Sequence, residues 1–534
     1  MRAFADLLEA LVHTPRRTRK LALLRAYFRA TPDPDRGYAL AALAGTLEMP
    51  SLTPSVIRGV AQARVDPRLF ALSHDFVGDL AETVALIWPE PPAPPGPPPG
   101  LAETVERLRA AGRAARPALL DALFDRLDPS ARFALIKLCA GGMRVGVSAR
   151  LARTALAEEF GRPLARIEEL WFALAPPYET LFAWLEGGAE PDADLSLAFR
   201  PMMLANPLEP ERLATLVPAE HIAEIKWDGV RVQAAATAGG RRLYSRAGED
   251  LGPAFPDLLD AMDWRGCVDG ELLVAIDGAP RPFADLQARL GRKRVTAKML
   301  AEAPAHIRAY DLLHDGVRDL RALPLEERRA RLAAWIATNR PARMDLSPEI
   351  PFAAWDALAA IRDAQRAEGQ EGLMVKRRDA PYAAGRPVGP WWKWKRDPLS
   401  ADCVLMYAQR GHGRRSSYYS DFTFGAWEPD PDGPVGAERL APVGKAYSGF
   451  TDEELVELDR WVRAHMTERF GPVRAVEQAL VLEVAFDAVQ LSRRHRSGVA
   501  MRFPRIKRIR WDKPATEAER VETLRALAAP AAAD

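Results

Sequence analysis

Lys226 stands in a setting that suits a nucleophile. It lies in the stretch HIAEIKWDGVR (221–231), between two short apolar runs, and Asp228 and Gly229 supply a turn directly after it. Such a turn can hold an amine at the mouth of a sheet, and lysine acts as a nucleophile once it has lost its proton. Taken alone, the stretch is better explained as a surface hairpin, so the rest of the chain must decide between the two interpretations.

The scarcity of lysine favours the chemical interpretation. Of the 74 Lys and Arg residues only 11 are lysine, and six of these lie between residues 226 and 395. Arginine stays protonated and cannot attack, whereas lysine can lose its proton and can also act as a compact point charge. Because this chain uses arginine as its general cation, the clustering of lysines favours a chemical function in this region.

A second lysine pattern, WWKWK (391–395), suits a phosphate clamp. Trp392 and Trp394 alternate with Lys393 and Lys395, so both ammonium groups share one face of the expected strand. Two like charges side by side are unfavourable unless an anion lies between them. A plain amphipathic strand is the alternative.

Other polar residues stand at the ends of expected strands in the same region. They occur in the strings EIKWDGVR, YSRAGEDL, VDGELLV, AYDLL and EGLMVKR, and comprise Glu224, Asp228, Arg231, Arg246, Glu271, Tyr310, Glu371 and Lys376. Each string alone is better explained by structure, for example DGEL as a hairpin. They gain a common function only from their order along the chain.

The elements that would position these residues predict a multidomain protein. Residues 1–195 show apolar residues at helical spacing, which predicts an all-α domain with a proline-rich loop at 89–100. Residues 200–396 alternate strands, glycine turns and helices, which predicts an α+β domain. Residues 398–514 predict short strands and one helix after a Thr451 cap, which fits a small closed β-barrel such as an OB-fold. Residues 515–534 are expected to form a flexible tail.

A glycine-rich turn precedes one helix of the first part. In GGMRVGVSARLARTALAEEFG (141–161), Arg144 lies in the turn and Ser148 is placed to cap the helix. Free amides at a helix N-terminus together with an arginine suit a backbone phosphate. A plain connection between two helices explains the segment equally well.

Composition excludes several classes of protein. Cys139, Cys267 and Cys403 are too scattered for a disulfide framework or a four-cysteine zinc site. HxxxH and HxH pairs are absent from the sequence, so a metal would be a hard cation held by carboxylates and phosphates. Charges interrupt every apolar segment and the N-terminus lacks the features of a secretory signal, so we expect a cytoplasmic protein and not a membrane protein.

The net charge of +2 hides an uneven distribution. Residues 493–513 contain seven Arg and two Lys against a single acid, Asp512. A basic patch on an otherwise balanced chain suggests a polyanionic partner, although a solvated face is a common alternative.

The order of the motifs resembles that of a known family. KxDGxR, SR, DGE, YDLL, EGLMVK, WxKxK and finally RxDK follow one another as in the covalent nucleotidyltransferases, and the set most closely resembles the ATP-dependent DNA ligases. The resemblance covers essentially the whole chain. The helical part is similar to the DNA-binding domain of three-domain ligases, and the C-terminal part, with GHGRRSSYYSDFTFGAWE and RFPRIKRIRWDK, resembles the ligase OB-fold. It implies DNA contacts by Arg144, Arg414 and Arg415.

The resemblance implies a covalent mechanism centred on Lys226. This residue would attack the α-phosphate of ATP, expel pyrophosphate and become an AMP-lysine. Glu224 would accept a hydrogen bond from the adenine 6-amino group, and Tyr310 would stack on the purine. Arg231 and Arg246 would hold the phosphate and ribose side, and Arg246 would also bind the 5′-phosphate of a nick.

Further residues would bind metal, the α-phosphate or the leaving group. By resemblance, Glu271 and Glu371 would bind Mg²⁺ or Mn²⁺, and Glu271 would also belong to the ATP site. Asp228 would shape the turn, touch the metal or face the DNA end. The residues implied for the α-phosphate are Lys376, Lys393 and Lys395, and those implied for pyrophosphate are Arg510, Asp512 and Lys513.

The chain departs from the family pattern at two positions. Ala247 stands where an asparagine often follows the SR pair, which puts one polar contact in doubt. His412 replaces a lysine that is common in the GKGRR-like loop, which would weaken one DNA contact.

The sequence therefore predicts an ATP-dependent DNA ligase that seals 5′-phosphate/3′-hydroxyl nicks in duplex DNA through enzyme-AMP and DNA-adenylate. An RNA ligase and a non-catalytic DNA-binding clamp of the same superfamily are the alternatives. A NAD-dependent ligase is disfavoured because three scattered cysteines cannot build its zinc module. We expect a monomer whose partner is nicked duplex DNA, associated with the nucleoid if the protein is bacterial.

Overall fold

The computed structural model describes two compact units. One contains residues 1–204, 230–346 and 381–387, and the other contains residues 205–229, 347–380 and 388–534. The described residues are all except 51, 92–95, 141–142, 144, 194, 293–294, 366–369, 412–417, 493–494 and 529–534.

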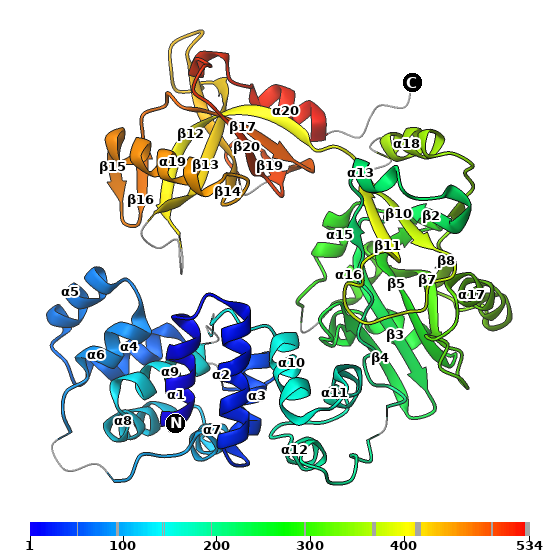
Figure 1. Ribbon diagram of the computed structural model, residues 1–534. Helices are drawn as coiled ribbons and strands as arrows, with labels where there is room; N and C mark the ends of the chain where they lie inside the picture. Colours follow the sequence, from blue (N-terminus) through cyan, green and yellow to red (C-terminus); the bar gives the residue numbers. More distant parts are fainter. Residues whose placement is uncertain are drawn as a thin grey trace. The chain divides into compact units, whose positions relative to one another are not determined.

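The first part of the chain is helical, as predicted, and is drawn from blue to cyan in Figure 1. In α1, Phe4, Leu7, Leu8 and Leu11 recur at helical spacing and are all buried. The helices are α1 (Arg2–Val12), α2 (Arg17–Ala30), α3 (Asp35–Ala44), α4 (Pro54–Gln62), α5 (Pro67–Val77), α6 (Leu80–Ile87), α7 (Leu101–Ala110), α8 (Arg116–Arg126), α9 (Pro129–Ala140), α10 (Ala149–Phe160), α11 (Leu164–Trp171) and α12 (Glu179–Leu185).

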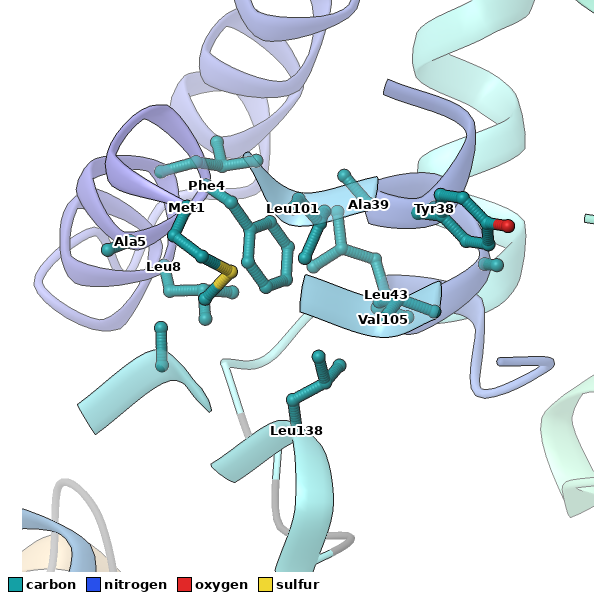
Figure 2. Close-up of a cluster of buried hydrophobic side chains, with 14 of the residues drawn as sticks. Met1, Phe4, Ala5, Leu8, Tyr38, Ala39, Leu43, Leu101, Val105 and Leu138 are labelled. Carbon is teal, nitrogen blue, oxygen red and sulfur yellow. The ribbon is translucent and has the colours of Figure 1, made fainter. Parts of the chain in front are cut away.

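The helices before and after the proline-rich stretch share one core. Phe4 of α1 lies in the same cluster as Leu101 and Val105 of α7 (Figure 2). The Asp35 carboxylate accepts hydrogen bonds from the backbone amides of Leu101 and Ala102 (3.0 and 2.8 Å), which satisfies free donors at the start of α7. The helices on both sides of residues 89–100 therefore belong to one domain, as predicted.

The middle part of the chain contains two sheets, and the first belongs to the unit of the helical region. Its strand order is β4-β3-β5-β7-β8, with β6 paired to β5. One face buries Val232 and Leu272, and because side chains alternate across a strand, Arg231 and Glu271 lie on the other face. The elements are β3 (Val230–Thr237), β4 (Gly240–Ser245), α14 (Pro256–Ala261), β5 (Gly266–Ile276), β6 (Ala279–Pro280), α15 (Phe283–Gln287), α16 (Ala297–Glu302), β7 (Ala305–His314), α17 (Leu325–Asn339) and β8 (Met344–Leu346).

The second sheet belongs to the other unit and has the strand order β1-β11-β10-β2-β9. Its core contains Leu373, Val375, Trp392 and Trp394. The expected domain at 200–396 is thus divided between the two units, because each sheet buries its own apolar face. The elements are β1 (Asn206–Pro207), α13 (Pro210–Leu213), β2 (His221–Ile225), β9 (Glu349–Ile350), α18 (Trp355–Ala364), β10 (Gly372–Arg377) and β11 (Trp391–Lys395).

The C-terminal part is strand-rich and belongs to the second unit. Its main sheet has the order β14-β13-β12-β16-β15, β17 pairs with both β12 and β20, and β18 pairs with β19. Thr451 caps α19 through a reciprocal pair of hydrogen bonds with Glu454, which confirms the predicted cap. The elements are β12 (Leu399–Arg410), β13 (Tyr419–Pro429), β14 (Glu438–Ala446), α19 (Asp452–Ala464), β15 (Met466–Phe470), β16 (Val473–Val476), β17 (Val481–Phe486), β18 (Ala488–Leu491), β19 (Val499–Arg502), β20 (Arg505–Arg510) and α20 (Val521–Ala528).

Of two predictions about this part, the closed barrel is not confirmed and the flexible tail is partly wrong. The strand pairings within the described residues do not close the sheet into a barrel, since β14 and β20 each end a row of strands. The prediction of a flexible tail is wrong for residues 521–528, because these form α20 and bury Val521 and Leu524 in the core of the strand-rich part. Residues 529–534 lie outside the described residues. Within the described part of the chain, helices long and apolar enough to cross a membrane are absent.

Candidate active site

Lys226 follows β2 and is held against the start of β10. Its backbone N–H donates to the carbonyl of Gly372 (2.8 Å), and its own carbonyl accepts from the N–H of Glu371 (3.2 Å). The Lys226 ammonium donates to the Glu371 carboxylate. Gly372 also lets β11 (Trp391–Lys395) approach closely: its φ is 132°, and a Cβ there would lie 2.4 Å from the Trp394 carbonyl oxygen. The backbone thus places the predicted nucleophile beside a predicted metal ligand.

Two ammonium groups set the charge of Glu371. Lys395 Nζ lies 3.3 Å from the carboxylate oxygen that also binds Lys226. Burial by itself raises the pKa of Glu371, but the two ammonium groups outweigh it and lower the pKa to about 2. Glu371 is therefore ionised at neutral pH.

The alternation predicted for WWKWK is present in β11. Trp392 and Trp394 lie in the core of the second sheet, and Lys393 and Lys395 lie on the opposite face. Lys395 bridges two carboxylates, because its Nζ also lies 3.1 Å from Asp487 Oδ2. Carboxylates thus occupy part of the place predicted for an anion.

Glu224 and Lys376 form a buried ion pair. The Lys376 ammonium donates to Glu224 Oε1 at 2.9 Å, each residue is 1% exposed, and the ammonium lies 4.4 Å from the centre of the Trp391 ring. The sequence assigned these two groups to different parts of a nucleotide. In this structure they bind each other.

Asp228 has a partner that the sequence did not reveal. Both oxygens of its carboxylate accept hydrogen bonds from the Arg502 guanidinium, one of them at 2.7 Å. Its backbone N–H donates to Gln370 Oε1 (3.1 Å). The side chains of Asp228 and Arg502 are only 15% and 16% exposed, so the pair is largely shielded from water. Asp228 therefore joins the turn after the nucleophile to β19 of the strand-rich part.

A pocket of about 370 Å³ lies at this junction. Charged residues of both signs dominate its lining, so it can bind phosphates through its cations and a hard metal ion through its carboxylates. They include Asp228, Glu371, Lys393, Lys395, Asp487 and Arg502.

The other unit holds Arg231 in a network that the sequence only partly indicated. Arg231 donates a pair of hydrogen bonds to Asp269 (3.0 and 2.6 Å), and the Tyr382 hydroxyl donates to the same carboxylate (2.5 Å). Burial opposes the charge on Arg231, but the Asp269 carboxylate outweighs it and raises the pKa well above its usual range. Asp269 is the first residue of the DGE string, which was the available signal for it.

Tyr310 owes its position to a bulge in β7. Gly270 pairs with Ala309 and Asp269 pairs with Asp311, so Tyr310 is the extra residue between them. The bulge shifts the alternation of side chains along β7. The Arg231 guanidinium lies 5.8 Å from the centre of the Tyr310 ring, as expected for neighbours on one polar face.

Glu271 and Arg246 complete this half of the predicted site. Glu271 of β5 lies opposite Arg231 of the neighbouring strand β3. Arg246 lies in the turn after β4, where desolvation and the like charges of Arg231 and Arg386 lower its pKa. Such an arrangement of cations attracts an anion.

The RxDK element is not brought to the predicted nucleophile. Lys513 Nζ and Arg510 Nη1 both contact Asp402 Oδ2 (2.8 and 3.2 Å), and Arg510 also pairs with Asp512. Among the described contacts of these three residues none reaches Lys226, and none of the three lines the pocket.

Several predicted contacts cannot be placed. Arg144, Arg414 and Arg415, together with His412, lie outside the described residues. Ser148 does cap α10, since its hydroxyl accepts from the Leu151 N–H (3.1 Å). Ala247 is exposed in the turn that carries Arg246.

The predicted metal ligands lie in different units. Glu271 belongs to the first unit and Glu371 to the second. Among the described residues, groups of three or more His, Cys, Asp or Glu that could hold a metal ion are absent. A metal at Glu371 would therefore need further ligands, and Mg²⁺ typically takes one or two carboxylates together with substrate phosphates and water.

Comparison with known proteins gives consistent results. A family model described as "ATP dependent DNA ligase domain" matches residues 202–395, and one described as "ATP dependent DNA ligase C terminal region" matches residues 415–513. A probable DNA ligase of Koribacter versatilis is 32% identical over 562 residues, which cover 98% of this chain and 95% of the relative. DNA ligase 1 of Korarchaeum cryptofilum is 32% identical over 425 residues, which cover 77% and 74% of the two chains.

Solved structures resemble the fold over nearly the whole chain. One named Pmar-Lig_PreS3 aligns over 95% of this chain and 99% of its own, with a TM-score of 0.59 and 17% identity. Another named Pmar-Lig_Pre. aligns over 96% and 99%, with a TM-score of 0.61 and 16% identity. At this level of identity the likeness concerns the fold alone.

Proposed function

The chain belongs to the ATP-dependent DNA ligase family, and from this premise we propose that it joins a 5′-phosphate to a 3′-hydroxyl at nicks in duplex DNA through a covalent AMP on Lys226. The observation that carries the proposal is the contact between the Lys226 amine and Glu371, with Lys395 on the same carboxylate. Glu371 and Lys395 line the pocket, and Lys226 contacts Glu371, so the proposed nucleophile lies beside the proposed metal ligand and a cation for phosphate.

The first step forms the enzyme–AMP bond. The Lys226 nitrogen, after losing a proton, attacks the α-phosphorus of ATP, so that a P–N bond forms, the bond to the β-phosphate oxygen breaks and pyrophosphate leaves. Lys393 and Lys395 hold the phosphates from the neighbouring strand. Because Glu371 stays ionised at neutral pH, its pair with the Lys226 ammonium must separate before the attack.

Glu224 and Tyr310 are the residues that the resemblance assigns to the adenine. Glu224 accepts from the adenine amino group once Lys376 has turned toward the α-phosphate, which breaks the present ion pair between them. Tyr310, lifted by the bulge in β7, stacks on the purine. Arg231 is held by its two hydrogen bonds to Asp269 and contacts the ribose and phosphates of the nucleotide.

The second and third steps use the DNA. An oxygen of the nick 5′-phosphate attacks the phosphorus of the AMP, the P–N bond breaks, and Lys226 takes up a proton. The 3′-hydroxyl oxygen then loses its proton and attacks the phosphorus of the 5′-phosphate, which forms the phosphodiester bond and releases AMP. Arg246 binds the nick 5′-phosphate in both steps.

Glu371 fits a metal ligand by its chemistry. It is ionised, its side chain is 19% exposed, and it faces a pocket large enough for phosphates. We propose Glu371 and Glu271 as ligands of Mg²⁺ or Mn²⁺, which when bound compensates the charge that develops on the transferred phosphoryl group. Until a nucleotide enters, Lys226 and Lys395 neutralise Glu371.

The remaining parts of the chain would bind DNA and the leaving group. We propose that the helical region binds nicked duplex DNA, that the strand-rich part is an OB-fold, and that the protein acts as a monomer. Arg510, Asp512 and Lys513 would orient pyrophosphate after the strand-rich part has moved, since Asp402 now binds Arg510 and Lys513.

Nick sealing by the purified protein tests the proposal. Duplex DNA with one nick, labelled at the 5′-phosphate, should be sealed with ATP and Mg²⁺ and not with NAD. Lys226→Ala should abolish sealing. Lys298→Ala is the matched control, because Lys298 of α16 is 81% exposed and should be dispensable. Sealing by Lys226→Ala, or equal sealing without ATP, would refute the proposal, and preference for a nick in RNA would favour the RNA ligase alternative.

A further inference from the structure

The turn that carries Arg246 is packed against an aromatic residue of the helical region. Gly248 has a φ of 88°, and a Cβ there would lie 2.4 Å from Cε1 of Phe172, the residue that ends α11. The same Cβ would lie 3.1 Å from Phe199. The ring of Phe172 therefore lies directly on the backbone of Gly248, two residues after Arg246.

The turn itself is tightly hydrogen-bonded. The Ser245 hydroxyl accepts from the backbone N–H groups of Ala247 (3.2 Å) and Glu249 (3.1 Å), and the Gly248 N–H donates to the Ser245 carbonyl (2.9 Å). These hydrogen bonds fix the backbone of Arg246 relative to that of Gly248. The contact of Phe172 with Gly248 therefore also fixes the backbone of Arg246.

An aromatic chain extends this contact into the first sheet. Phe172 packs edge-on against Phe199 (ring centres 4.6 Å apart), and Phe199 packs against Tyr244 of β4 (5.6 Å). The Tyr244 hydroxyl donates to the Leu197 carbonyl (2.7 Å). The connection between the helical region and the sheet is thus anchored to β4, the strand that leads into the turn.

Two further contacts of the same unit join the helical region to the middle part. Arg321 Nη2 donates to Glu169 of α11 (2.7 Å). On α10, the guanidinium of Arg150 lies against Gly385, where a Cβ would be 2.2 Å from Nη1. The helical region therefore contacts the middle part of the chain at Gly248, Arg321 and Gly385.

Phe172 also contacts the helix that follows the candidate DNA-binding turn. The guanidinium of Arg153, in the middle of α10, lies 5.3 Å from the centre of the Phe172 ring and 5.6 Å from that of Trp171. A continuous set of packed groups thus runs from α10 through Phe172 to the Arg246 turn.

We propose that Phe172 is a positioning residue for nick sealing: by packing on Gly248 it makes the position of Arg246 depend on the helical region that binds the DNA. The inference rests on the proposed role of Arg246 at the nick 5′-phosphate. DNA bound by the helical region is then presented to Arg246 in a fixed register. The first step needs no DNA and therefore does not depend on how the DNA is presented to Arg246.

Separate measurement of the steps tests the inference. Phe172→Ala should slow DNA-adenylate formation by pre-adenylated enzyme about 10- to 100-fold, because a displacement of about 1 Å at a positioning group can cost about 100-fold, and it should slow self-adenylation much less. Phe172→Leu, which refills the space with apolar atoms, should recover most of the rate. Phe76→Ala is the matched control, since Phe76 of the helical region is 92% exposed and should have no effect.

A double-mutant cycle shows whether Phe172 acts through Arg246. In an Arg246→Ala background, Phe172→Ala should cause little additional loss, because the group that it positions is already gone. Equal slowing of self-adenylation by Phe172→Ala, or an undiminished effect in the Arg246→Ala background, would overturn the inference. Self-adenylation by wild-type protein is read in the same series, so failure of the proposed function would appear separately as a lack of enzyme-AMP.

Discussion

The pair between Asp228 and Arg502 should control the DNA-dependent steps and not the first step. It joins the turn after the nucleophile to β19, while the RxDK element proposed for pyrophosphate is held at Asp402. This arrangement is therefore not the one that orients the leaving group of the first step. We assign it to the steps that follow pyrophosphate release, and we expect Arg502→Ala to impair those steps.

The size of the effect follows from the burial of the pair. An exposed ion pair is worth at most about 1 kcal/mol, and loss of one partner of a fully buried pair costs about 3–5 kcal/mol. The side chains of Asp228 and Arg502 are 15% and 16% exposed and share two charge-assisted hydrogen bonds. We therefore take the free energy lost with the pair to lie between these two limits. A loss of about 2 kcal/mol corresponds to about 30-fold in the population of this arrangement.

The assay is single-turnover nick sealing by pre-adenylated enzyme, compared with the rate of self-adenylation by the same variant. Arg502→Ala should slow sealing about 30-fold, the full population effect, and should not slow self-adenylation, because we assign the first step to an arrangement without this pair. In an Asp228→Asn background the loss caused by Arg502→Ala should shrink, since the partner charge is absent. Arg469→Ala, at an exposed arginine of β15, is the matched control. Equal slowing of both steps, or additive losses in the double variant, would refute the reasoning.

Three further perturbations test other parts of the site. Glu371→Gln should lower the free energy of unfolding by about 3 kcal/mol at pH 7, because the pKa of Glu371 is depressed from 4.5 to about 2 in the folded state. This stabilisation is present above pH 4.5 and is lost as the pH falls toward 2. In denaturation experiments from pH 7 to pH 3, the difference in unfolding free energy between wild type and variant should therefore shrink. Glu224→Ala should lower the free energy of unfolding by about 3–5 kcal/mol, because it removes the carboxylate that pairs with the buried Lys376 ammonium. Replacing both Glu224 and Lys376 by apolar residues should recover part of this loss in urea denaturation. An unchanged stability of the single variant would show that the pair is not buried as described. Gly372→Ala should lower both stability and self-adenylation, since its Cβ would meet the Trp394 carbonyl; normal adenylation in a folded Gly372→Ala protein would contradict the backbone account.

The arrangement of WWKWK could be predicted from the sequence because side chains alternate along a strand. Lys393 and Lys395 share one face of β11, and the structure places Trp392 and Trp394 in the core on the other face. The ordered strings placed Lys226 near Glu371 although 145 residues separate them. The resemblance supplied that pairing, since the periodicity of the strands does not link them.

The Asp228–Arg502 pair, the bulge at Tyr310 and helix α20 could not be predicted, because they depend on long-range packing that leaves little trace in the sequence. Asp228 is paired with Arg502 across 274 residues, and the sequence offers many equivalent arginines near position 502. The bulge at Tyr310 arises from the register of β5 and β7 and is marked in the sequence only by Gly270, opposite which the strands approach closely. The Ala- and Pro-rich composition after residue 515 concealed the spacing of Val521 and Leu524, which places both on one face of α20.

Peptide mapping of the adenylated protein tests the central claim most directly. Purified protein incubated with ATP and Mg²⁺, without DNA, is digested under conditions that preserve the P–N bond and is analysed by mass spectrometry. We predict one AMP adduct, on the peptide that contains Lys226, which disappears when nicked DNA is added and is absent from Lys226→Ala. An adduct on another residue such as Lys395, or an unmodified protein, would contradict the account.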